Sequence, residues 1–149
     1  MVLKLSSLKL DENLVENGVW CPLEDGAEIL VAKSGNTKHR KFVQQARKPY
    51  RSYELAGKDL PEDIARKIGI EATARCILLG WRGIIDDDGQ PIPFNHENAV
   101  QALSIEGFMS RVLGFAGDEQ LFRGGVSLDD SRKNSPTSST GSSSTDEAV

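Results

Sequence analysis

The sequence contains few of the residues that build metal or cross-linked sites. Only two cysteines, Cys21 and Cys76, and two histidines, His39 and His96, occur in 149 residues, and all four are widely separated. Zinc modules bring their ligands in closely spaced pairs, so we expect no bound metal. We interpret both cysteines as buried free thiols rather than as a disulfide.

Motifs for covalent catalysis or phosphate binding are also missing. No glycine-rich loop is followed by Lys and Ser or Thr, and Ser34–Gly35 lacks the flanking glycine of a nucleophile elbow. Asp86, Asp88 and Glu97 have EF-hand spacing, but Pro91 falls where the sharp turn requires glycine. We interpret this segment as a solvated acidic turn, and we expect neither a cofactor nor enzymatic activity.

Long apolar runs are absent from the sequence as well. None approaches the roughly 20 residues that cross a bilayer, and Met1–Leu10 lacks the apolar block and cleavage site of a secretory signal. The 18 Lys and Arg and 22 Asp and Glu give a net charge of −4. This mixture suits solubility and does not by itself favour nucleic acid or membrane. We therefore expect a cytoplasmic protein without a membrane partner.

Length and composition predict one folded domain followed by a polar tail. A chain of 149 residues supports a single core of modest size. Composition changes near Gly124–Gly125, and from Asn134 onward Ser, Thr, Gly and Pro dominate. Such a segment buries too little apolar surface to offset the entropy lost on ordering. We predict a globular domain over residues 1–125 and a disordered tail over residues 126–149.

Local patterns predict an α+β fold that is mainly helical. Two short strands, Val19–Leu23 and Glu28–Ala32, should form a hairpin across the turn at Asp25–Gly26. Apolar residues at helical spacing predict four helices, which run over Thr37–Arg47, from Leu60 to about Trp81, from Asn95 to Leu103 and over Glu106–Phe115. The hairpin should pack on this small helical bundle.

Three further expectations concern the connections. We expect Lys9–Val15 to be irregular, and Pro49 should end the Thr37–Arg47 helix because it cannot continue the hydrogen-bond ladder. Leu121 and Phe122 should close the core.

The strongest charge feature is a basic segment from Lys33 to Arg51, which holds seven Lys and Arg and no acid. On a helix, Phe42, Val43 and Ala46 would face the core while the lysines face solvent. The segment is either an ordinary solvated face or a docking surface for an acidic partner, with nucleic acid as a weaker alternative. The candidate docking residues are Lys38, Arg40, Lys41, Arg47, Lys48 and Arg51.

Several segments between Lys9 and Ser135 follow one another in a recognisable order. They are Asn17–Trp20, Gly26–Ala32, Ser34–Asn36 with Arg40–Lys41, Ala74–Trp81, Gly89–Ala99, and the closing Phe122–Arg123 and Lys133–Ser135. Together they resemble the tail assembly chaperones of long-tailed, siphovirus-type bacteriophages, in which the counterpart of Ala74–Trp81 is a long helix ending in tryptophan. One departure is Asn95, where the resemblance leads us to expect Ser or Thr; Asn caps a helix equally well.

The resemblance implies a function in tail building. It implies a protein that binds the tape measure protein and the tail tube (major tail) protein in the host cytoplasm and is absent from the mature virion. Many such chaperones are made in two lengths by ribosomal frameshifting, and this chain would correspond to the short form. The alternative is a small nucleic-acid-binding phage accessory protein that uses Lys33–Arg51. Whether the chain forms a homo-oligomer is left open.

Overall fold

A computed structural model describes residues 1–124, in which three strands form an antiparallel sheet in the order β1-β2-β3. The strands are β1 (Val19–Pro22), β2 (Glu28–Val31) and β3 (Leu78–Arg82). Cys21 lies opposite Ile29, which lies opposite Trp81 on the next strand, so these three side chains share one face of the sheet. All three are buried, which identifies the face that carries the core.

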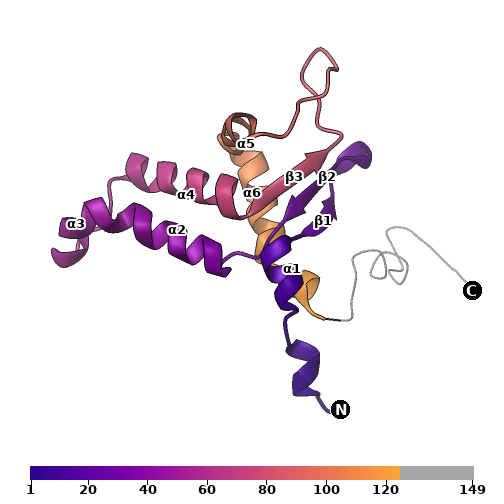
Figure 1. The fold of residues 1–149 in the computed structure, drawn as a ribbon, viewed down its shortest axis with the longest axis horizontal. Helices are drawn as coiled ribbons and strands as arrows, with labels where there is room; N and C mark the ends of the chain where they lie inside the picture. The colour runs from indigo at the N-terminus through magenta and orange to yellow at the C-terminus, as the bar shows by residue number, and fades with distance from the viewer. Residues whose placement is uncertain (125–149) are drawn as a thin grey trace, which may run out of the picture.

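Helices make up most of the remaining described chain (Figure 1). The α-helices are α1 (Glu12–Asn17), α2 (Thr37–Arg47), α3 (Arg51–Leu55), α4 (Glu62–Cys76), α5 (His96–Leu103) and α6 (Glu106–Ala116). Short 3-10 helices are η1 (Leu5–Leu8), η2 (Glu24–Gly26), η3 (Lys48–Tyr50) and η4 (Glu119–Phe122). The mainly helical α+β prediction is confirmed, whereas the predicted tail lies outside the described residues.

The N-terminal hairpin forms as the sequence predicts. Its turn places Asp25 at φ 58° and Gly26 at φ 81°, and the amide of Leu23 donates to the carbonyl of Ala27 at 2.7 Å. Positive φ is cheap for glycine and tolerated by aspartate, so Asp-Gly suits this position. The turn therefore sets the antiparallel register of β1 and β2.

The core lies between the sheet and helices α4, α5 and α6. Trp81 is its largest aromatic side chain: the ring makes edge contacts with Phe94 at 5.0 Å and with Phe108 at 6.3 Å between centroids. Its Nε1 donates to the carbonyl of Ile92 at 2.7 Å, which satisfies the indole nitrogen in a mostly apolar setting. Leu121 is partly buried against this core and Phe122 is fully buried, in agreement with the prediction that these two residues close it.

The long helix ends earlier than predicted, and this is the main correction to the fold. α4 stops at Cys76, and Leu78–Arg82 forms the third strand, so Trp81 lies on a sheet and not at a helix end. A short apolar run fits a buried helix or a buried strand equally well. Pairing with β2, some fifty residues earlier in the chain, decides for the strand.

One smaller prediction is also wrong. Residues within the supposedly irregular Lys9–Val15 begin helix α1, because Asp11 accepts from the amides of Asn13 and Leu14 and caps it. The prediction for the next helix is confirmed: α2 ends at Arg47, and Pro49 lies in the first turn of the 3-10 helix η3, where its missing N–H costs nothing.

Helices α2, α3 and α4 form an arm that projects from the sheet (Figure 1). α2 runs away from the sheet, α3 lies at the far end, and α4 returns beside α2. α2 and α3 contain no buried residue, and the buried residues of α4 all lie at or beyond Ala72, next to the sheet. The outer part of the arm is therefore well exposed.

Candidate functional site

The root of the arm depends on one buried amide. Asn36 is 3% exposed, and its Oδ1 accepts from the backbone N–H of His39 at 2.9 Å, which caps α2. Its Nδ2 donates to the carbonyls of Lys33 at 2.7 Å and Cys76 at 3.1 Å. The same side chain thus starts α2 and joins it to the end of α4.

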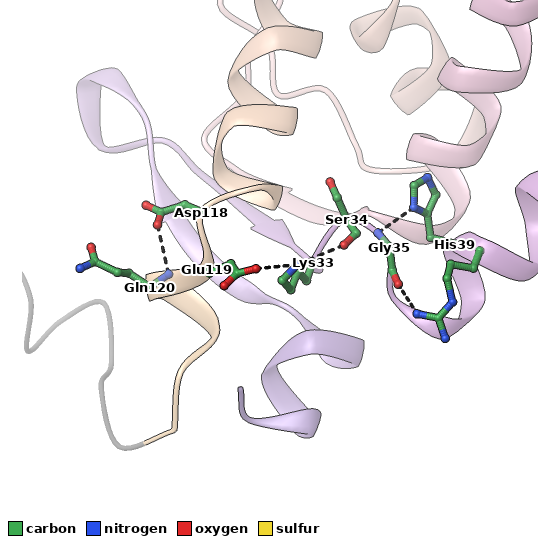
Figure 2. Close-up of polar contacts among 8 residues, drawn as sticks. Lys33, Ser34, Gly35, His39, Asp118, Glu119 and Gln120 are labelled. Atoms are coloured by element: carbon green, nitrogen blue, oxygen red, sulfur yellow. Dashed lines mark hydrogen bonds and ion pairs between the residues drawn. The ribbon is translucent and has the colours of Figure 1, made fainter. Parts of the chain in front are cut away.

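The loop before α2 is held by further polar contacts (Figure 2). Gly35, at φ 80°, donates its N–H to Nδ1 of His39 at 2.9 Å, and its carbonyl accepts from Arg40 Nη1 at 2.6 Å. Burial lowers the pKa of the His39 imidazole. Since Nδ1 accepts a hydrogen bond, the imidazole is neutral in this arrangement.

Lys33 connects this loop to the end of α6. Its Nζ lies 3.4 Å from the carbonyl oxygen of Ser34 and 4.0 Å from Oε2 of Glu119 in η4 (Figure 2). The side chain of Lys33 is 18% exposed, so this cation is largely used within the fold. Lys33 is therefore a poor candidate for contacting a partner.

The six candidate docking residues lie along the arm and are all exposed. Lys38, Arg40, Lys41 and Arg47 belong to α2, Lys48 to η3 and Arg51 to α3. The ion pairs within residues 1–124 include none of these six cations. All 22 acidic residues of the chain lie outside the Lys33–Arg51 segment. The segment from Lys38 to Arg51 therefore presents positive charge that no ion pair within residues 1–124 neutralises.

The opposite face of α2 packs on α4, whereas the sequence predicts that it faces the core. Phe42, Val43 and Ala46 are partly buried, and the guanidinium carbon of Arg75 on α4 lies 5.8 Å from the centroid of the Phe42 ring. The apolar stripe holds the helix in place, which leaves the charged side free. The predicted division of α2 into an inner and an outer face is confirmed.

A second surface feature lies between α4 and α5. It is a groove of about 300 Å³ with Ile70 and Val100 in its lining. Arg66 donates to the carbonyl of Ser104 across it at 3.1 Å. At one end, Glu71 accepts from Arg75 Nε at 3.1 Å and lies 3.2 Å from Nε2 of His96. Both signs of charge line the groove, so it lacks the single polarity of the arm.

The residues considered for catalysis or metal binding are not assembled into a site. Cys21 and Cys76 are free and buried; burial raises the pKa of Cys21 to about 12 and also raises the pKa of Cys76. Asp86 Oδ1 accepts from the amides of Asp88 and Gln90, both at 2.9 Å, so this carboxylate closes the exposed turn. Over residues 1–124, no three His, Cys, Asp or Glu side chains group closely enough to hold a metal ion.

No helix among the described residues is both long and apolar enough to cross a bilayer.

Two features of the arm escaped the sequence reasoning. Leu55 is 81% exposed at the tip, and it lies four residues after Arg51, on the same face of α3. The four-residue spacing of Arg51 and Leu55 is present in the sequence, but the helix α3 that gives it meaning was not predicted. The link between Asn36 and Cys76 spans forty residues and had no local signal.

Comparison with known proteins places the chain in a phage setting. The family model described as YdaY prophage protein matches residues 34–133, about two thirds of the chain. The chain therefore belongs to this family, and it is a phage-derived protein. The match includes the whole of the arm and the third strand. Searches among curated proteins and among solved structures found no match.

Proposed function

We propose that this protein is a tail assembly chaperone that binds the tape measure protein and the tail tube protein during tail construction. It acts in the host cytoplasm, through the basic arm, and leaves before the virion is complete. The single observation that carries the proposal is the row of six exposed cations on a projecting arm, unpaired within residues 1–124, in a chain of a prophage family.

Two kinds of observation support this proposal. The order of segments from Asn17–Trp20 to Phe122–Arg123 resembles the tail assembly chaperones, and family membership independently indicates phage origin. One part of the resemblance does not carry over: the stretch that ends in Trp81 is a strand here and not the end of a long helix. The proposal therefore depends on the remaining segments and on the arm.

The physics of the arm suits reversible binding of a protein. Exposed charges add association rate and specificity more than raw affinity, because water and salt screen them. An assembly chaperone must release its partner when tube subunits take its place, so modest and salt-sensitive affinity is an advantage. A surface without large apolar area also protects the free chaperone from self-aggregation.

A non-enzymatic function agrees with the chemistry of the described residues. Both thiols are buried, and burial raises the pKa of each, so neither is poised as a thiolate nucleophile. His96 lies beside Glu71 on the exposed side of α4 and α5, and its side chain is 46% exposed. A partly solvated pair of this kind supports helix packing without implying catalysis.

Coexpression with the tape measure and tube proteins of the same prophage tests this function. The tagged chain should retain the tape measure protein and keep it soluble, whereas an unrelated coiled coil of similar net charge should not be retained. Mass spectrometry of purified particles should find tube protein without this chain. Failure to retain either partner, or the presence of the chain in finished tails, would contradict the proposal.

The basic segment also supports the alternative of a nucleic-acid-binding accessory protein. That function predicts a salt-dependent shift in the mobility of DNA or RNA, which disappears when Lys38→Glu and Lys41→Glu are combined. If such a shift occurs at physiological salt while the tail proteins are not retained, the alternative replaces the chaperone function.

A further inference from the structure

The cations of the arm form two parallel rows. Arg40 and Arg47 are seven residues apart, and so are Lys41 and Lys48, which places each pair on one line along the helix. Lys48 follows α2 directly and keeps helical dihedrals, φ −54° and ψ −44°, so the second row continues past the last residue of α2. At 1.5 Å rise per residue, the two members of each row are about 10.5 Å apart along the axis.

The tip of the arm carries an exposed apolar side chain. Arg51 and Leu55 share a face of α3, and Leu55 is 81% exposed. An exposed leucine costs solubility, and it offers apolar area that a partner can cover. The surface made of Arg40, Lys41, Arg47, Lys48, Arg51 and Leu55 is called the basic ladder below.

We propose that the basic ladder receives an acidic amphipathic α-helix of a partner protein, with carboxylates seven residues apart facing the two rows and an apolar side chain packed on Leu55. This inference deepens the proposed function by naming the chemistry of the partner segment.

Charge complementarity identifies an acidic occupant, and the spacing identifies a helix. A helix presents residues i and i+7 on one line with the same rise of about 10.5 Å that the rows have. An extended strand covers that distance in about three residues, and residues three apart point to opposite faces of a strand. A strand therefore cannot direct two carboxylates at one row without a mismatch in spacing.

The charge of the rest of the protein argues against a long polyanion as the occupant. Duplex DNA carries one charge per about 1.7 Å, so a duplex crossing the arm brings many phosphates close to the remaining surface. Acidic residues lie elsewhere on the described chain, among them Glu54, which stands beside Leu55 at the arm tip, and Asp59. A helix as short as α2 can place its carboxylates on the two rows of α2, which hold no acidic residue.

Fluorescence anisotropy with synthetic probes tests the inference on the full chain. The probe is a labelled helical peptide of about three heptads, with glutamates at two adjacent heptad positions and a leucine at one end. A peptide of the same composition with the glutamates spread around the helix is the matched control. A single-stranded DNA oligonucleotide of equal charge tests the other class of ligand. The heptad peptide should bind tightest, and binding should weaken as salt rises from about 50 to about 200 mM.

The protein variants separate the ladder from net charge. Lys41→Glu with Lys48→Glu should weaken peptide binding about tenfold or more, because two attractive contacts become repulsive. Lys4→Glu with Lys9→Glu makes the same change of charge outside the arm and should leave binding within about twofold. Leu55→Ala should weaken binding about threefold, since it removes apolar area that the bound peptide would cover. Circular dichroism shows whether the variant with Lys41→Glu and Lys48→Glu is folded. If it is not, Lys41→Gln with Lys48→Gln gives the same test without repulsion.

Each outcome decides the matter. Equal binding of the spread peptide, tighter binding of the oligonucleotide, or an unchanged affinity of the Lys41 and Lys48 variants overturns the inference. If the variants still retain the tape measure protein, the chaperone function stands and the docking surface lies elsewhere. If the peptide binds as expected while no tail protein is retained, the ladder stands and the chaperone function fails.

Discussion

Asn36 connects the beginning of α2 with the end of α4: its Nδ2 donates to the carbonyl of Cys76 at 3.1 Å, while its Oδ1 caps α2 through the amide of His39. The residue is 3% exposed, so neither contact is shared with bulk water. Three of the four hydrogen-bonding functions of the amide are used once the bond to Lys33 is included. This one side chain therefore links the two helices of the arm where they meet the sheet.

Replacing Asn36 by aspartate should separate its two functions, which are capping α2 and donating hydrogen bonds to the carbonyls of Lys33 and Cys76. Aspartate keeps the cap but cannot donate, so the carbonyls of Lys33 and Cys76 lose their partner and face a carboxylate. We expect the free energy of unfolding to fall by about 2 kcal/mol in urea titrations followed by circular dichroism. Asn95→Asp is the control, because Asn95 caps α5 at an exposed position, and its stability should change by less than about 0.5 kcal/mol. Equal effects at both positions would show that the Cys76 contact contributes little.

Trp81→Phe should destabilise the protein more than the same change at the other tryptophan. Phenylalanine leaves the carbonyl of Ile92 without its indole donor and leaves a void beside Phe94 and Phe108, at a combined cost of about 2–3 kcal/mol. Trp20 lies on the outer face of the sheet, with the guanidinium of Arg82 3.7 Å from its ring centroid, and its replacement should cost about 1 kcal/mol or less. Urea midpoints measured by circular dichroism compare the two. A larger loss at Trp20 would contradict the assignment of the inner face.

The thiol of Cys21 should be inert in the folded protein and should make stability depend on alkaline pH. Burial raises its pKa to about 12, from 9.0. The unfolded thiol therefore ionises first, and stability present below pH 9 should be lost as pH rises toward 12. The variant Cys21→Ala should be less stable overall, but it should lose less stability over this pH range because it lacks the titrating thiol. A thiol reagent at neutral pH should modify neither cysteine until denaturant is added; rapid labelling of the native protein would contradict the buried assignment.

Mild acid should loosen the loop before α2 through His39. Burial lowers the pKa of its imidazole below 6.5, and protonation would remove the acceptor at Nδ1 that the Gly35 amide uses. The unfolded chain then takes up the proton more readily than the folded protein does. The stability contributed by neutral His39 is therefore present above pH 6.5 and is lost as the pH falls through the pKa of His39 in the folded protein.

The variant His39→Asn tests this dependence, since an asparagine oxygen can accept the same bond without titrating. Its stability should change less than that of the original chain between about pH 7 and pH 5.5, a window above the range where most carboxylates titrate. Parallel curves for the two proteins would show that the histidine does not contribute through its charge.

Local chemistry was enough to predict the hairpin, helices α2, α5 and α6, and the two-sided character of α2. Asp25–Gly26, Asn36 and Asn95 each act on neighbours within a few residues, so their signals are present in any short window of sequence. Lys38, Lys41 and Lys48 were predicted to face solvent for the same reason, and all six candidate cations are exposed.

The third strand and the arm could not be predicted in this way. Leu78–Arg82 is apolar enough for a buried helix or a buried strand, and only its pairing with β2 makes it a strand. The position of the basic segment depends on Asn36 reaching Cys76 and on α2 packing beside α4, both of which are contacts between distant residues. The sequence by itself therefore determined the charge of the basic segment and the local helices, because these follow from neighbouring residues. Tertiary structure alone decided that the charge stands on a projecting arm and ends at an exposed leucine, because only long-range pairing and packing set where elements lie.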